Sequence, residues 1–250
     1  MRDILGGEIK TWFTELQKAQ ATVLKDMLIE IFRRNPKSLI FKGGTALAFF
    51  YGADRFSEDV DLSSDSIENY AIIDDALESF EKTYRHRIIN DWENEIEQAS
   101  SKFRRYHLIF MHDAEDIHTM IDYSIGKCIL KPIQKDLAND YYASKISVMA
   151  PEEILAEKVR AIYSRQKGRD LYDLHHLSVT MHIRIRRDLI FDKFDEDPKL
   201  KQVKYSFLTL EKRIEDMKKS WKDLEGLVNG FDNIDFEMMK NEVLAVFRNI

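Results

Sequence analysis

The chain lacks most features that mark secreted or membrane-spanning proteins. It has one cysteine, Cys128, so no internal disulfide can form, and this fits a reducing cytoplasm. No apolar run reaches the roughly 18 residues of a transmembrane helix, and residues 1–10 lack the basic-then-apolar order of a signal peptide. Glycine and proline are also scarce, at 9 and 4 residues, so we expect few long flexible joints.

Positive charge is in short supply too. The 38 Lys and Arg residues are outnumbered by 44 Asp and Glu, which gives a net charge of -6. Proteins that coat nucleic acid are usually basic, so any contact with nucleic acid must use local patches. The basic tracts at 102–107 and 184–187 either bind phosphates or are simply solvated. Apolar residues make up 44%, enough for the core of one large domain or two small ones.

Hydrophobic periodicity separates a mixed first part from a helical second part. Residues 8–34 carry the apolar stripe of one long helix. Apolar runs and alternation predict strands at 38–41, 58–63, 87–89, 106–111 and 119–125. The 3.6-residue pattern predicts further helices at 46–51, 70–83 and 92–100. After Pro151, a suitable first helical residue, only helices are predicted, beginning with one that Gly168 closes.

The predicted fold class is therefore α+β. A small mixed β-sheet flanked by helices would occupy residues 1–148, together with the N-terminal helix. A helical C-terminal domain would occupy residues 149–250. The boundary is placed where the pattern of short strands gives way to helical periodicity.

Residues 41–63 carry the most informative pattern, F-K-G-G-T-A-L-A-F-F-Y-G-A-D-R-F-S-E-D-V-D-L-S. The Gly43-Gly44 turn between a strand and a helix allows the backbone to approach a ligand closely. Amides at the start of that helix, which Thr45 is placed to cap, can receive a phosphate oxygen. Asp59 and Asp61 are two positions apart on a predicted strand, so their carboxylates share one face.

Two carboxylates this close repel each other, and a divalent cation removes that cost. Mg²⁺ prefers hard oxygen ligands and keeps positions open for substrate phosphates. Two such ions, about 3.5–4 Å apart, can clamp the attacking and leaving oxygens of an in-line displacement. A third carboxylate usually completes the site. Asp122, on a predicted strand, is the best candidate: it would ligate a metal or take the proton of an acceptor hydroxyl.

The glycine turn followed by D-x-D on the next strand resembles the nucleotidyltransferase superfamily of the DNA polymerase β type. More closely, G-G-T-A-L with R-F-S-E-D-V-D-L is similar to the AbiEii/AbiGii toxin family, the toxin half of abortive-infection toxin–antitoxin systems. The stretch E-E-I-L-A-E-K-V-R-A-I-Y-S-R-Q-K-G-R-D-L-Y-D-L at 152–174 also resembles that family.

The resemblance implies roles for individual residues. The residues that hold the nucleoside triphosphate would be Gly43, Gly44 and Thr45. The ligands of two magnesium ions would be Asp59, Asp61 and Asp122. Lys158 would contact the phosphates and Asp170 would support the active site, in a cleft between the two domains. Asp173, in the same R-D-L-Y-D motif, is the lesser candidate.

Each of these roles has a plainer alternative. Arg55 either orients phosphate or metal, or pairs with a neighbouring acid, and Ser57 either contacts the nucleotide or caps the turn before the strand. Lys158 is otherwise a lysine whose stem covers an apolar helix face. Asp170 is otherwise part of an ion pair at a helix N-terminus. Asp122 is otherwise a structural ion-pair partner.

The resemblance also implies a function: a magnesium-dependent enzyme that transfers a nucleoside monophosphate from an NTP to a hydroxyl acceptor, releasing pyrophosphate. The implied acceptor is RNA, specifically tRNA, the implied partner is a cognate antitoxin, and the implied setting is phage defence in the cytoplasm. Two alternatives stay open. The acceptor is a small molecule or a protein, which the acidic charge favours, or the chain is a non-catalytic module of this fold that only binds a partner.

Overall fold

The structure, a computed structural model, describes residues 9–84, 91–100 and 102–248, and the chain separates into two compact units. Unit 1 comprises Met1–Gly52 and Phe56–Met149, and unit 2 comprises Ala53–Arg55 and Ala150–Ile250. The short segment Ala53–Arg55 thus belongs with the helical unit, which a single boundary near residue 148 does not anticipate. The strand expected at 87–89 lies outside the described residues. Among the described helices, none has both the length and the apolar character of a membrane span.

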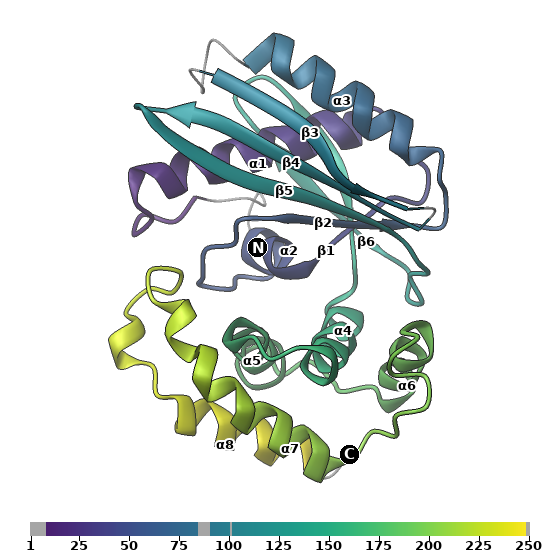
Figure 1. The fold of residues 1–250 in the computed structure, drawn as a ribbon, viewed down its shortest axis with the longest axis vertical. Helices are drawn as coiled ribbons and strands as arrows, with labels where there is room; N and C mark the ends of the chain where they lie inside the picture. Colours follow the sequence, from purple (N-terminus) through teal and green to yellow (C-terminus); the bar gives the residue numbers. More distant parts are fainter. Residues whose placement is uncertain (1–8, 85–90, 101, 249–250) are drawn as a thin grey trace. The chain divides into compact units, whose positions relative to one another are not determined.

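The described part of unit 1 contains a mixed seven-stranded sheet with the order β3-β4-β5-β2-β1-β7-β6 (Figure 1). Its strands are β1 (Ile40–Lys42), β2 (Val60–Ser64), β3 (Asp91–Ala99), β4 (Phe103–His112), β5 (Glu115–Ile125), β6 (Ile133–Ala138) and β7 (Ala143–Val148). Strand β2 lies between β1, to which it is antiparallel, and β5, to which it is parallel. The D-x-D segment therefore leads into an interior strand of the sheet.

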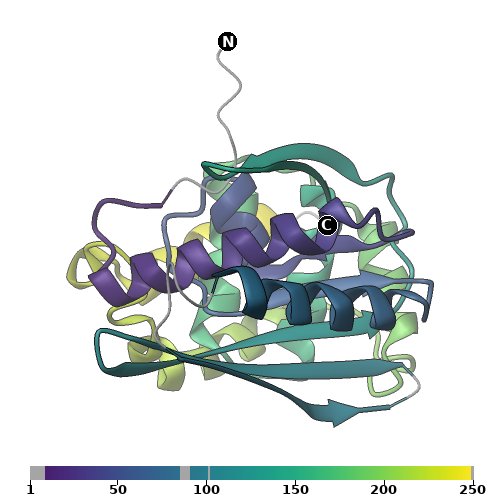
Figure 2. The same cartoon turned by 90° about the horizontal axis from the view of Figure 1, so that it is seen from above.

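Three helices complete unit 1: α1 (Glu15–Arg33), α2 (Gly43–Phe50) and α3 (Asn69–Tyr84). Helices α1 and α3 lie side by side (Figure 2), and their apolar residues share one buried core with the sheet. The sheet contributes Phe41, Leu62 and Tyr123 to this core, one from each of three adjacent strands. Because side chains alternate along a strand, the residues beside these three point to the opposite face.

Two helix predictions in this unit need correction. The first helix begins at Glu15 rather than near residue 8, because Thr14 and Gln17 form a capping box there, with each side chain bound to the other's backbone. The helix predicted at 92–100 is wrong: this segment is strand β3. Its pairing with β4 over almost its full length outweighs the helical pattern, an example of tertiary context overriding local propensity.

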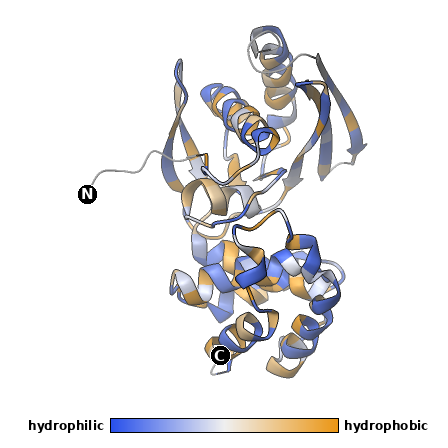
Figure 3. Ribbon diagram, turned by 90° about the vertical axis from the view of Figure 1, so that its left-hand side faces the viewer, coloured by the Kyte–Doolittle hydropathy of each residue, from blue (hydrophilic) through white to orange (hydrophobic). Residues whose placement is uncertain are grey.

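Unit 2 is helical in its described part. Its α-helices are α4 (Pro151–Ser164), α5 (Gly168–His175), α6 (Arg187–Glu196), α7 (Phe207–Asp216) and α8 (Phe236–Phe247). The short helical turns η1 (His176–Thr180), η2 (Met217–Leu224) and η3 (Phe231–Asn233) connect them. Figure 3 shows hydrophobic and hydrophilic residues alternating along these helices, as expected when one face of each is buried. The α+β fold class is thus confirmed, with a mixed sheet in one unit and helices in the other.

Two residues explain where α4 and α5 begin. Pro151 occupies the start of α4, where its missing N–H costs no helical hydrogen bond. Gly168 begins α5 rather than ending the preceding helix as predicted. A Cβ at Gly168 would lie 2.8 Å from the backbone oxygen of Ser220, so glycine allows α5 to pack closely against η2.

Candidate active site

Four polar residues lie in one row across adjacent strands of unit 1. Lys42 on β1 pairs with Asp61 on β2, Asp61 pairs with Asp122 on β5, and Asp122 pairs with Arg105 on β4. Residues that are paired across neighbouring strands point to the same face of a sheet. This set, the polar row, therefore lies on the face opposite the apolar core that contains Phe41 and its neighbours.

Asp61 faces the glycine bend directly. Gly43 has a φ of +78°, a conformation that side-chain-bearing residues rarely adopt. A Cβ at Gly43 would come within 2.0 Å of Oδ2 of Asp61, so the carboxylate occupies the space that any other residue would fill. Gly44 follows as a buried residue of α2. Gly43 and Asp61 are thus packed so closely that only glycine fits at position 43.

The first turn of α2 has no side-chain cap among the described residues. The residue that precedes the helix, Lys42, gives no side-chain hydrogen bond to the first turn within the described residues. Helix α2 begins at Gly43, so the prediction that Thr45 caps it is wrong. Amides at a helix N-terminus attract anions such as phosphate, and this end lies beside the carboxylate of Asp61.

Thr45 holds the backbone that carries Asp59. Its fully buried hydroxyl donates to the carbonyl of Asp59, and the hydroxyl of Thr119 donates to the carbonyl of Glu58. The amide of Gln20 also donates to the carbonyl of Glu58, at 3.4 Å. Asp59 itself is partly buried and comes one residue before strand β2. The hydroxyl of Thr45 is therefore a support for the acidic segment.

Asp122 is held by Arg105, which sequence reasoning placed only in a basic tract. Nε of Arg105 lies 2.7 Å from Oδ1 of Asp122, and Nη2 lies 2.7 Å from Oδ2. The hydrogen bond to Asp122, with the charges of Asp122, Glu97 and Asp59, raises the pKa of Arg105 despite partial burial. The alternative in which Asp122 has an ion-pair partner thus has structural support.

A sequence signal for this pair exists. Strands β4 and β5 are joined by a turn at Asp113 and Ala114, both with positive φ. Once that turn is placed, the antiparallel register follows residue by residue and sets Arg105 opposite Asp122. The periodicity of the sequence located both strands but not the residues at which they pair.

The predicted metal ligands do not form a complete metal cage on their own. In the described ranges, no group of three or more His, Cys, Asp or Glu side chains could hold a metal ion. Both oxygens of Asp122 face Arg105, which accounts for part of this. Mg²⁺, however, is commonly bound through one or two carboxylates plus substrate phosphates. The acids at 59 and 61 beside the glycine bend fit an ion that binds together with a triphosphate.

A second charged group is buried inside unit 2. Arg55 reaches Asp173 with Nε at 2.6 Å from Oδ1 and Nη2 at 2.8 Å from Oδ2. Nζ of Lys158 lies 2.6 Å from Oδ2 of Asp173 and 3.2 Å from Oδ1 of Asp170. Arg165 contacts the two oxygens of Asp170 at 2.8 and 2.9 Å. We call these five residues the buried ion cluster.

The electrostatics of the buried ion cluster favour negative aspartates. Burial alone raises the pKa of Asp173, but the charges of Arg55 and Lys158 hold it well below its usual range. Burial likewise opposes the effect of Lys158 and Arg165 on Asp170, whose pKa is also lowered. Three cationic and two anionic side chains leave a surplus of one positive charge.

The segment Ala53–Arg55 is fixed in unit 2 by several contacts. Besides the ion pair of Arg55, its backbone forms a bridge with Val228. The hydroxyl of Tyr172 donates to the carbonyl of Asp54 at 3.2 Å, and burial raises the pKa of Tyr172 to about 12. Arg55 thus pairs with Asp173, 118 positions away, a partner that the sequence did not suggest.

The predicted site residues therefore fall into two groups. Those in unit 1 are Gly43, Gly44, Thr45, Ser57, Asp59, Asp61 and Asp122. Those in unit 2 are Arg55, Lys158 and Asp170. The structure adds Arg105 to the first group and gives Asp173 a central place in the second. Ser57 is partly buried and lies between the two motifs that the sequence highlights.

Comparison with known proteins identifies a family and a shared fold. The family model of the nucleotidyl transferase AbiEii toxin, type IV toxin–antitoxin system, matches residues 31–240. JHP933 from Helicobacter pylori has a similar crystal structure, with a TM-score of 0.61 and 20% identity over 95% of this chain and 92% of that one. A second H. pylori structure, of a protein inferred to be a nucleotidyltransferase, has a TM-score of 0.61 and 18% identity over 95% of both chains. These two likenesses show a shared fold. No curated protein matches the chain.

Proposed function

The chain belongs to the AbiEii family of nucleotidyl transferase toxins of type IV toxin–antitoxin systems, and on this premise we propose that it transfers a nucleoside monophosphate from an NTP to a hydroxyl group of RNA, specifically tRNA, with Mg²⁺. The family implies a nucleotide substrate and an antitoxin partner. The proposal extends this to two magnesium ions, an RNA acceptor and a role in phage defence.

The observation that carries the proposal is the fit between Asp61 and Gly43. Oδ2 of Asp61 lies within 2.0 Å of where a Cβ of residue 43 would be, so the acid packs directly against the glycine bend. The start of α2 attracts phosphate, while the acids at 59 and 61 supply oxygen donors beside it. A divalent ion, when bound there, would neutralise negative charge on the triphosphate and the acids together.

The proposed reaction is an in-line displacement at the α-phosphorus. The acceptor oxygen forms a bond to this phosphorus, the bond to the bridging oxygen breaks, and pyrophosphate leaves with that electron pair. The proton of the acceptor hydroxyl passes to the carboxylate of Asp122. The contribution of the chain is chiefly to position the reactants and to match their charge.

Arg105 and Lys158 have supporting roles in this proposal. Arg105 binds both oxygens of Asp122 and so fixes the direction of the carboxylate that receives the proton. Lys158 lies in the buried ion cluster, with Asp170 and Asp173 as its two acceptors. The contact with the phosphates that the sequence predicts for Lys158 stays a prediction.

The test is a transfer assay with each of the α-labelled NTPs and total RNA, with EDTA or with added Mg²⁺. We expect label in the tRNA band only when Mg²⁺ is present. Asp59→Asn should abolish the labelling, while Asp65→Asn, an exposed acid just beyond β2, should preserve it. Label that appears only on protein or on small molecules would rule out the RNA acceptor, and full activity of Asp59→Asn would rule out the assigned site.

A further inference from the structure

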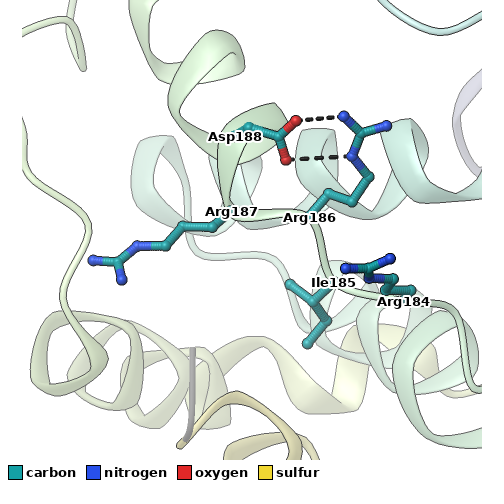
Figure 4. A pocket seen from close by; sticks show the side chains of 5 residues that line it. All are labelled: Arg184, Ile185, Arg186, Arg187 and Asp188. Atoms are coloured by element: carbon teal, nitrogen blue, oxygen red, sulfur yellow. Dashed lines mark hydrogen bonds and ion pairs between the residues drawn. The ribbon is translucent and has the colours of Figure 1, made fainter.

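A hollow in the surface of unit 2 is lined by basic residues outside the site described above. Residues Arg184 to Asp188 surround it, and its volume is about 510 Å³ (Figure 4). Asp188 is the acid among them. Its carboxylate is bound by Arg186, whose Nε lies 3.3 Å from Oδ1 and whose Nη2 contacts Oδ2. The charges of Arg186 and Asp188 therefore offset each other.

Arg184 and Arg187 keep their charge uncompensated. Both are exposed, and among the described residues neither makes an ion pair with a carboxylate. In Figure 4 the two guanidinium groups lie away from the bound pair of Arg186 and Asp188. Counted over its lining residues, the hollow has three arginines and one aspartate, a surplus of two positive charges in a chain whose net charge is -6, while Glu152 and Asp192 also act on Arg186. A local patch of this kind is what an acidic protein needs to bind a polyanion.

An exposed aromatic ring adjoins these charges. The guanidinium of Arg187 lies 5.6 Å from the ring centroid of Phe191, which is 38% exposed. The two residues are four positions apart on α6, so they share one face of the helix. The helix also begins at Arg187, which adds the positive end of its dipole. Cations that bind phosphates beside a ring that stacks on bases are typical of sites for single-stranded nucleic acid.

We propose that this surface, the arginine hollow (Arg184, Arg186, Arg187 and Phe191), binds a single-stranded segment of RNA. Arg184 and Arg187 bind backbone phosphates, Arg186 is oriented by Asp188, and Phe191 stacks on a base. The inference rests on the proposed function in one respect: it supplies the docking surface for the RNA acceptor. Its ligand chemistry requires both phosphates and bases, which a free phosphate or an acidic peptide does not provide.

The first test measures binding of a fluorescein-labelled oligoadenylate, about 20 nucleotides long so that it exceeds the site size of such surfaces, by anisotropy across a salt series. Arg184→Ala/Arg187→Ala should weaken binding by about tenfold and reduce the slope of log K against log salt by about 1.4, because two phosphate contacts are lost. The matched control is Lys219→Ala/Lys222→Ala, which removes two exposed charges from η2 in the same unit. It should stay close to the wild type.

The second test separates stacking from charge. Phe191→Leu keeps an apolar side chain but removes the ring, so it should weaken oligoadenylate binding by about fivefold. Binding of inorganic polyphosphate, which has no bases, should not change. If Phe191→Leu weakens the binding of oligoadenylate and of polyphosphate equally, or weakens neither, the assignment of Phe191 is wrong. Equal binding by the hollow variant and the lysine control would overturn the site.

The transfer assay distinguishes this inference from the proposed function. RNA labelling that is the same in the hollow variant and the lysine control, with equal oligoadenylate affinity, rejects the hollow and leaves the proposed function standing. If the wild-type protein binds oligoadenylate through the arginine hollow but labels no RNA, the hollow stands and the proposed function is rejected. Failure of the wild-type protein to bind oligoadenylate rejects the hollow outright.

Discussion

The polar row of unit 1 and the buried ion cluster of unit 2 use the same pairing chemistry in different surroundings. In the polar row, the side chains of Arg105 and Asp122 are 30% and 24% exposed. In the cluster, Asp173 is fully buried and Lys158 is 9% exposed. Both groups place an arginine against an aspartate with two short hydrogen bonds. The two groups differ in their exposure to water. They should therefore also differ in how much stability is lost when one partner is removed.

This difference suggests a division of labour. A partly exposed pair gains little net stability, because water competes for both charges. It can therefore rearrange around a substrate at low cost. A buried charge that loses its partner is left without compensation, which strongly destabilises the fold. We expect changes in the polar row to reduce activity with little unfolding, and changes in the cluster to reduce stability first.

The largest expected effect on activity comes from Asp61→Asn. The amide has almost the same shape as the acid but has lost its charge, so the fold should persist while transfer falls by about 10³-fold or more. Thermal unfolding and the NTP transfer assay together measure this. Asp65→Asn is the control, an exposed acid at the other end of the strand. Substantial activity in Asp61→Asn would remove the polar row from the active site.

The corresponding change in the cluster is Asp173→Asn. It leaves Arg55 and Lys158 without their shared partner inside unit 2, so the free energy of unfolding should fall by about 3–5 kcal/mol in urea titrations at neutral pH. The control is Glu215→Gln, which breaks the exposed pair with Lys240. That loss should be below about 1 kcal/mol. Similar losses of unfolding free energy in Asp173→Asn and Glu215→Gln would contradict the expected difference between buried and exposed ion pairs.

The dependence of stability on pH provides an independent test of the buried ion cluster. The pKa of Asp173 is lowered in the folded protein, so its stabilising effect is complete above about pH 4, the ordinary pKa of an unfolded aspartate. The effect is lost as the pH falls below that value towards the lowered pKa. Stability of the wild type should therefore fall more steeply below pH 4 than that of Asp173→Asn. Parallel curves in urea titrations at several pH values would contradict the assigned shift.

A smaller change tests the glycine bend. Gly43→Ala places a methyl group against Oδ2 of Asp61, and we expect activity to fall by about 10²-fold because a small displacement of a catalytic group has large effects. Gly52→Ala is a close control. Its φ of +73° is also positive, but a Cβ there meets nothing within 4 Å. The two variants share a backbone cost of about 1 kcal/mol, so only Gly43→Ala should lose activity.

The motifs in the sequence located the acids and the glycine bend because their information is local. Asp61 and Gly43 are identified by a turn, a strand and the alternation of side chains, all within about twenty residues. The class of the fold also follows from periodicity, and the strands at 106–111 and 119–125 lie within β4 and β5. Local patterns thus determined most of unit 1, apart from strands β3, β6 and β7.

The partners of the charged residues needed tertiary information. Arg55 pairs with a residue 118 positions away, and no local pattern favours Asp173 over the acids beside Arg55. The partner of Arg105 could be identified only from the strand register, because a shift of one residue would turn its side chain to the other face of the sheet. Strand β3 was mistaken for a helix because its pairing with β4 determines its conformation. Sequence identified the chemical groups, and tertiary pairing decided which of them meet.

The smallest effect, and the sharpest test of the polar row, is expected from Arg105→Lys. Lysine retains the charge but cannot bind both oxygens of Asp122 at once, so the carboxylate loses its fixed direction. We expect kcat to fall by about tenfold while KM for the NTP and the unfolding free energy change little. Arg104→Lys is the control, because Arg104 points to the other face and pairs with Asp74 at 2.9 Å. If Arg105 were only structural, both variants would affect stability alike and leave kcat unchanged. A fall in kcat confined to Arg105→Lys would instead show that the direction of one carboxylate limits the reaction.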